Sequence, residues 1–132
     1  MASARARRIT EAYGRWSRGV DAPEMPPDDY EFHPPPDLPG EDVYRGPAAM
    51  RDFSTAMSES FEWLRIEPLG FEESGSEVLV RVRLTAKGRS SGIDVEREEF
   101  HLWSFGPERP VKLSCFTERE DALAAAEGEF PS

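Results

Sequence analysis

The sequence contains a single cysteine, Cys115, and no long hydrophobic run among its 132 residues. One thiol excludes an internal disulfide and a zinc site built from several cysteines. No apolar stretch approaches the ~20 residues of a membrane-spanning helix, and no apolar segment follows the basic start MASARARRIT, as a secretory signal peptide would require. We therefore expect a cytoplasmic protein without membrane contact.

Basic residues are scarce relative to acidic ones, 16 against 26, for a net charge of −10. A surface with this charge repels phosphate groups, so we expect no nucleic-acid partner. The exception is the segment 1–20, which holds five arginines and one glutamate. That segment is either an anion-binding arm or the solvated start of a helix with a frayed end.

Histidine is also rare, with only His33 and His101 in the chain. Neither belongs to an HxxxH or cysteine-pair spacing typical of metal centres, and there is no glycine-rich phosphate loop. We therefore expect no bound metal and no cofactor. An unperturbed imidazole titrates at a pKa of about 6.5, so either histidine is a candidate for proton transfer near neutral pH.

Apolar residues at helical spacing predict amphipathic helices over residues 4–19 and 47–60. Gly19 is expected to end the first of these helices, and a short terminal helix is expected over residues 119–127. The proline-rich stretch 23–40 is expected to be an ordered loop that includes a short strand at 29–33.

Alternating or continuous apolar patterns predict four further strands, over residues 63–72, 77–89, 93–105 and 111–117. Helices followed by a run of neighbouring strands are typical of an α+β fold. The length fits one domain over residues 1–132, with frayed ends at 1–4 and 129–132.

Charge pairing sets the expected register of the hairpin formed by the strands 77–89 and 93–105. A slip by one residue would turn every side chain of a strand to the opposite face of the sheet. Opposite charges can pair across the strands if one face carries Arg81, Arg83, Lys87, Asp94, Glu96 and Glu98. The other face then gathers the apolar residues Val78, Val80, Val82, Leu84, Ile93, Val95, Trp103 and Phe105.

The same register places Arg97, Glu99 and His101 on the apolar face. Buried charges are costly unless they are paired or wetted. Two interpretations remain open. Arg97 and Glu99 form a buried ion pair or emerge into solvent at the strand ends, or the three residues are the polar patch of a small-molecule pocket.

Five segments follow one another in a recognisable order: AYGRWSRGVDA (12–22), FHPP (32–35), YRGPAAMRDF (44–53), GRSSGIDVEREEFHLWSF (88–105) and FTEREDALAAAEG (116–128). Their order and spacing resemble the nuclear transport factor 2-like superfamily and, within it, the SnoaL-like branch. The resemblance implies a cone-shaped fold, a cystatin-like α+β barrel in which a bent antiparallel sheet wraps around the N-terminal helices. It also implies an apolar pocket between them and a homodimer formed through the outer face of the sheet.

The superfamily includes ketosteroid isomerases, polyketide cyclases, epoxide hydrolases, dehydratases and binding domains without chemistry. Its isomerases use a helix tyrosine, a base on the first strand and an acid on a long strand, which the resemblance matches with Tyr13, His33 and His101. Histidines then replace both isomerase carboxylates, and the last strand lacks the acid of SnoaL-type cyclases. The candidate catalytic residues are Tyr13, His33, Glu99 and His101, and the candidate ligand-binding residues are Trp16, Val80, Val82, Arg97, Trp103 and Phe116.

Three functions remain open. The first is a protein that binds a small hydrophobic molecule without chemistry, which the missing acids favour. The second is a cofactor-free isomerase, cyclase or dehydratase acting on a hydrophobic carbonyl compound. In that enzyme His33 or His101 takes a proton beside the carbonyl, and Tyr13 donates a hydrogen bond to the developing oxyanion. The third is an interaction module that associates through its sheet.

Overall fold

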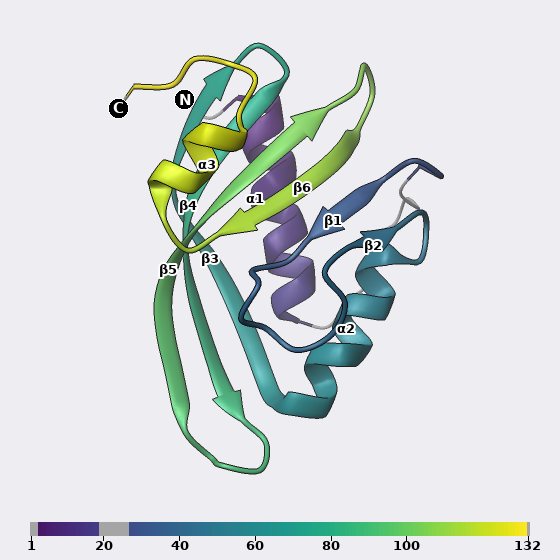
Figure 1. Cartoon of the computed structure of the whole chain (residues 1–132), viewed down its shortest axis with the longest axis vertical. Coiled ribbons are helices and arrows are strands. Elements are labelled where there is room, and N and C mark those ends of the chain that lie inside the picture. The colour runs from purple at the N-terminus through teal and green to yellow at the C-terminus, as the bar shows by residue number, and fades with distance from the viewer. Residues whose placement is uncertain (1–2, 19–26, 132) are drawn as a thin grey trace.

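The computed structural model describes residues 3–18 and 27–131. One curved sheet of six strands, in the order β2-β1-β6-β5-β4-β3, forms its framework (Figure 1). Helices α1 (Ala4–Ser17) and α2 (Ala49–Ser60) pack on one face of the sheet, and α3 (Arg119–Ala125) packs against β5 and β6 from the other. The strands are β1 (Glu31–His33), β2 (Tyr44–Arg45), β3 (Phe61–Ser74), β4 (Glu77–Gly88), β5 (Asp94–Phe105) and β6 (Pro110–Phe116). This arrangement confirms the predicted α+β class.

The sheet is mixed, whereas the resemblance implied a wholly antiparallel one. β1 pairs with β6 in parallel, and β2 pairs antiparallel with β1. β2 was not predicted, because two residues are too few to show an alternating pattern. The parallel pair was not predicted because β1 and β6 come from opposite ends of the chain, and nothing local in either segment specifies such a partner.

Helix α1 begins where the sequence supplies a cap. The Ser3 hydroxyl accepts a hydrogen bond from the Ala6 backbone N–H at 3.0 Å, which satisfies one of the free donors of the first turn. The helix ends at Ser17, and the predicted terminator Gly19 lies outside the described residues. Ile9 and Tyr13 are fully buried on its inner face, as their spacing predicts.

Two arginines of α1 hold the helix to turns of the sheet. Arg5 donates to the carbonyl of Gly75 at 2.7 Å, and Arg8 donates to the carbonyl of Glu108 at 2.8 Å. These contacts favour a packed helix start over a free anion-binding arm.

The predicted register of the long hairpin is confirmed. Arg83 lies opposite Glu98, and Arg81 donates to the Glu98 carboxylate at 2.9 Å on the outer face. On the inner face Val80 lies opposite His101, and Val82 lies opposite Glu99. The strand parity therefore carries Glu99 and His101 into the interior.

The apolar face of this hairpin is exposed to solvent at its distal end. Ile93 precedes β5 and is 65% exposed, and Val95 is 37% exposed. The tip of the hairpin extends beyond the helices (Figure 1), so a side chain there has the right parity but nothing to pack against.

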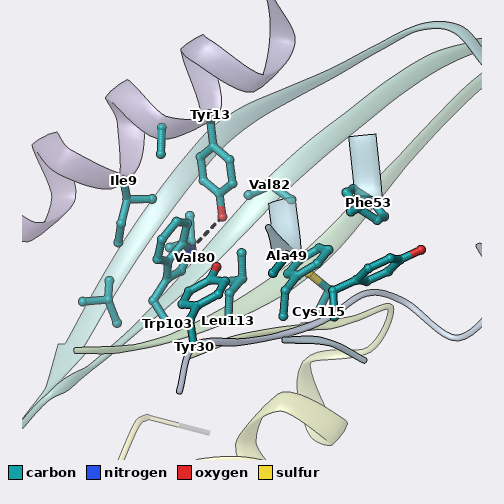
Figure 2. Packing of buried hydrophobic residues seen from close by; sticks show 14 of the residues in the cluster. Ile9, Tyr13, Tyr30, Ala49, Phe53, Val80, Val82, Trp103, Leu113 and Cys115 are labelled. Atoms are coloured by element: carbon teal, nitrogen blue, oxygen red, sulfur yellow. Dashed lines mark hydrogen bonds between the residues drawn. The ribbon is translucent and has the colours of Figure 1, made fainter. Parts of the chain in front are cut away.

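The main core fills the space between the sheet and the first two helices (Figure 2). A smaller cluster, with Leu79, Leu102 and Ala122 at its centre, lies on the opposite face beneath α3. Among the described helices none is long and apolar enough to span a membrane.

Candidate functional site

A chain of polar side chains crosses the inner face of the sheet. Arg97, Glu99 and His101 are spaced two residues apart along β5. Because successive side chains of a strand lie on opposite faces, these three lie on the same face. Their neighbours across the hairpin are Leu84, Val82 and Val80, so the polar groups are set into an apolar wall.

Tyr13 lies at the buried end of this chain. Its hydroxyl oxygen accepts a hydrogen bond from the Trp103 indole Nε1–H at 2.9 Å (Figure 2) and lies 2.7 Å from His101 Nδ1. Because the indole can only donate, the hydroxyl proton is left for His101 Nδ1. This network therefore assigns the Nε2–H tautomer to a neutral His101.

Glu99 takes the next place in the chain and is only 2% exposed. Its Oε1 accepts from His101 Nε2 at 2.9 Å, and its Oε2 accepts from Arg97 Nε at 2.8 Å and Nη2 at 2.7 Å. Burial by itself raises the pKa of Glu99. Hydrogen bonds from His101 and Arg97, together with the positive charge of Arg97, outweigh that effect, so the pKa is lowered and the carboxylate stays ionised.

Arg97 joins the buried groups to the surface. The guanidinium edge that faces away from Glu99 forms a two-point ion pair with Asp37, in which Nη2 donates to Oδ1 at 3.0 Å and Nη1 donates to Oδ2. The hydrogen bond from Arg97 lowers the pKa of Asp37, and the same bond raises the pKa of Arg97. The resulting chain runs from solvent at Asp37 to the core at Tyr13.

Burial raises the pKa of Tyr13 well above its ordinary value, although the Trp103 hydrogen bond opposes the shift. Tyr13 therefore remains a hydroxyl donor at neutral pH. Burial likewise raises the pKa of the Cys115 thiol, which keeps it protonated and a poor nucleophile.

A small cavity of about 20 Å³ adjoins the centre of the chain, with room for about one water molecule. Glu99 and His101 form part of its wall, beside the thiol of Cys115. The rest of the wall is apolar and comes from α1, α2, β1, β3, β4, β6 and the loop between β1 and β2. An ion-paired carboxylate and an imidazole thus face an otherwise apolar space, where they can bind a polar group or move a proton.

The structure brings most of the predicted site residues together. Trp16 lines the cavity with Glu99 and His101. The Tyr13 hydroxyl contacts His101, and Trp103 donates a hydrogen bond to that hydroxyl. The remaining predicted residues close to the site are the strand neighbours Val80 and Val82, both 0% exposed, and the rim residue Arg97.

His33 and Phe116 do not join the site. Phe32 takes the inward position of β1, so His33 points to the opposite face and pairs with Glu31 at 2.8 Å. In β6 the inward residue is Cys115, and Phe116 packs with the cluster under α3. The candidate catalytic residues therefore do not all meet at one cavity, because His33 lies away from it, and the candidate ligand-binding residue Phe116 does not line it.

Sequence reasoning missed Asp37 and the cavity positions of Leu38 and Cys115. The alternation of the last strand, with Leu113 and Cys115 on one parity, could have placed Cys115 on the inner face. Nothing in the sequence pairs Asp37 with Arg97. Within residues 3–18 and 27–131, no three His, Cys, Asp or Glu side chains gather closely enough to hold a metal ion.

No protein-family model matches the sequence, and no curated protein matches it. Solved structures do match. TerC, co-crystallised with polyporic acid, superposes with a TM-score of 0.74 at 16% identity over 92% of this chain and 97% of its own. An NTF2-like protein of unknown function from Burkholderia pseudomallei K96243 has a TM-score of 0.74 at 19% identity, over 96% of this chain and 100% of its own.

A candidate SnoaL-like polyketide cyclase from Jannaschia sp. CCS1 has a TM-score of 0.69 at 15% identity, over 90% of this chain and 88% of its own. Identities this low establish the fold and leave the activity open. The chain therefore has the fold of NTF2-like, SnoaL-like proteins, as the five sequence segments predicted.

Proposed function

We propose that the protein binds a small, mainly apolar molecule in the cavity, with a polar group of the ligand facing Glu99 and His101. The observation that carries the proposal is the placement of an ionised carboxylate, Glu99, hydrogen-bonded to the imidazole of His101, in an otherwise apolar wall. Sites for small molecules have this composition, because apolar walls supply affinity and a few polar groups fix orientation. The co-crystallisation of TerC, a protein of the same fold, with polyporic acid supports the proposal.

A ligand larger than water requires the cavity to widen, because sites for drug-sized molecules enclose roughly 300 Å³ or more. Trp16, Leu38 and Met50 are wall residues that are only partly buried, so we expect the widening to begin with them. The net charge of −10 and the single free thiol support a cytoplasmic protein that acts on small molecules and not on nucleic acids.

A second candidate function is acid–base catalysis on a carbonyl compound, and the continuous chain from Asp37 to Tyr13 favours it. In this reaction the Glu99 carboxylate, paired with His101, takes a proton from the carbon beside the carbonyl, and the electrons of the C–H bond move to give an enolate. The same pair returns the proton at another carbon, which isomerises the ligand. Tyr13 acts as a positioning residue, because its hydroxyl proton is engaged by His101.

Protein-observed NMR with a bicyclic ketone such as 2-tetralone tests binding. We expect shifts confined to residues around the cavity, weaker binding in His101→Ala, and unchanged binding in the control His33→Ala. Catalysis is tested by deuterium uptake beside the carbonyl in D2O, which His101→Ala should slow by about 100-fold or more. Binding without deuterium uptake would leave the first function alone, and shifts scattered over the surface would contradict both.

A further inference from the structure

The loop between β1 and β2, residues 34–43, forms one side of the cavity. Pro35 and Leu38 both line it, and the Leu38 N–H donates to the Pro35 carbonyl at 3.1 Å, which closes a tight turn. Asp37 lies within this turn and binds Arg97. A displacement of this turn away from Arg97 would therefore carry the wall residues Pro35 and Leu38 away from the cavity.

Arg97 lies between this loop and the buried groups. Its side chain is 24% exposed, and one edge of the guanidinium is committed to Glu99, which is itself part of the cavity wall. The other edge holds only the Asp37 carboxylate among the contacts of the described residues. This outer edge is thus a carboxylate-binding position at the rim of the cavity, occupied by a group of the protein itself.

The Asp37 carboxylate is easy to replace. Its side chain is 58% exposed, against 24% for Arg97, so Asp37 is the partner that water can solvate when the pair opens. A carboxylate from a ligand would make the same two-point bond to the guanidinium. The exchange would leave the number of charges around Arg97 unchanged and would return Asp37 to water.

We propose that Asp37 is the latch of the cavity: it holds the 34–43 loop closed on Arg97 in the free protein, and an acidic group of the ligand takes its place when the cavity opens. This proposal rests on the proposed binding function and adds to it a ligand class, an apolar molecule that carries a carboxylate. The apolar part lies against the walls, and the acid lies at the rim on Arg97.

Cys115 offers a direct measure of opening, because it is the only cysteine, lines the cavity and is 5% exposed. Its alkylation by iodoacetamide, which is small and uncharged, is followed by mass spectrometry in wild type and in Asp37→Ala. Labelling through global unfolding is subtracted by using the free energy of unfolding of each variant. We expect about two- to fivefold faster labelling in Asp37→Ala, the population change that an exposed ion pair can produce.

Glu98→Ala is the matched control. It removes an exposed cross-strand pair, Arg81–Glu98 at 2.9 Å, from the outer face of the sheet, where no part of the cavity lies. Its labelling rate should equal that of wild type. Equal rates in Asp37→Ala and wild type would overturn the latch.

Cyclohexanecarboxylate and its uncharged analogue cyclohexanecarboxamide test the ligand class by protection of Cys115. We expect the carboxylate to protect at lower concentration than the carboxamide, and to protect Asp37→Ala better than wild type. Equal protection by both probes would overturn acid recognition by Arg97. Faster labelling of Asp37→Ala without protection by either probe would support the latch while contradicting binding of an apolar acid.

Discussion

Replacing Tyr13 by phenylalanine removes one oxygen atom from the core and leaves the shape of the side chain almost unchanged. The hydroxyl of Tyr13 accepts from Trp103 and donates to His101, and it is the contact that joins the two. In Tyr13→Phe the Trp103 N–H loses its acceptor and His101 Nδ1 loses its donor. The three side chains are at most 3% exposed, so water does not replace the lost bonds.

A buried polar group left without a partner costs about 1–3 kcal/mol. Two such groups would lower the free energy of unfolding by roughly 2–6 kcal/mol, and the variant regains part of this because it no longer buries a hydroxyl. We therefore expect Tyr13→Phe to lower the free energy of unfolding by about 2–4 kcal/mol.

Urea denaturation followed by circular dichroism measures this difference, with an unchanged dependence on urea as the check that the folded state is intact. Tyr30→Phe is the control. Tyr30 is also buried, but among the described residues its hydroxyl reaches only the Met50 thioether, at 3.7 Å, so its removal should cost less than about 1 kcal/mol. Equal losses in the two variants would refute the assigned network.

Three further predictions concern other parts of the chain. Because the folded-state pKa of Glu99 is lowered, its contribution to stability is fully present above its unfolded pKa, near 4.3, and is lost as the pH falls through the lower folded value. Urea titrations between pH 3 and 6 should therefore show a steeper fall in wild type than in Glu99→Gln, and parallel curves would contradict the assignment. Glu77 is 5% exposed and accepts from the backbone N–H groups of residues 127 and 128, so Glu77→Gln should destabilise the fold by about 1–3 kcal/mol. Amide exchange at these two positions should also accelerate, and unchanged exchange would show that Glu77 does not hold the C-terminal segment. Finally, the outer face of β4 and β5 carries rows of Arg and Glu side chains that can pair across a two-fold axis, so light scattering at tens of micromolar should give the mass of a dimer. A monomer mass would contradict the predicted homodimer.

The sequence by itself determines which face of the long hairpin carries the site. β4 and β5 are neighbours joined by a short turn, and both alternate with a period of two residues. Pairing of Arg81 and Arg83 with glutamates selects one register from two, and that choice carries Glu99 and His101 inward. Likewise, helical spacing alone predicts that Tyr13 faces the core.

Only the tertiary structure decides which distant segments of the chain contact those residues. The three residues of β1 are too few to show an alternation, so the outward orientation of His33 depends on which side of β1 meets the helices once β6 has paired with it. The bond between Asp37 and Arg97 joins a loop to a strand that is 60 residues away in the chain. Contacts of this kind follow from the curvature of the whole sheet, because local propensity and periodicity act over a few residues and carry no information about which distant segments a bent sheet brings together.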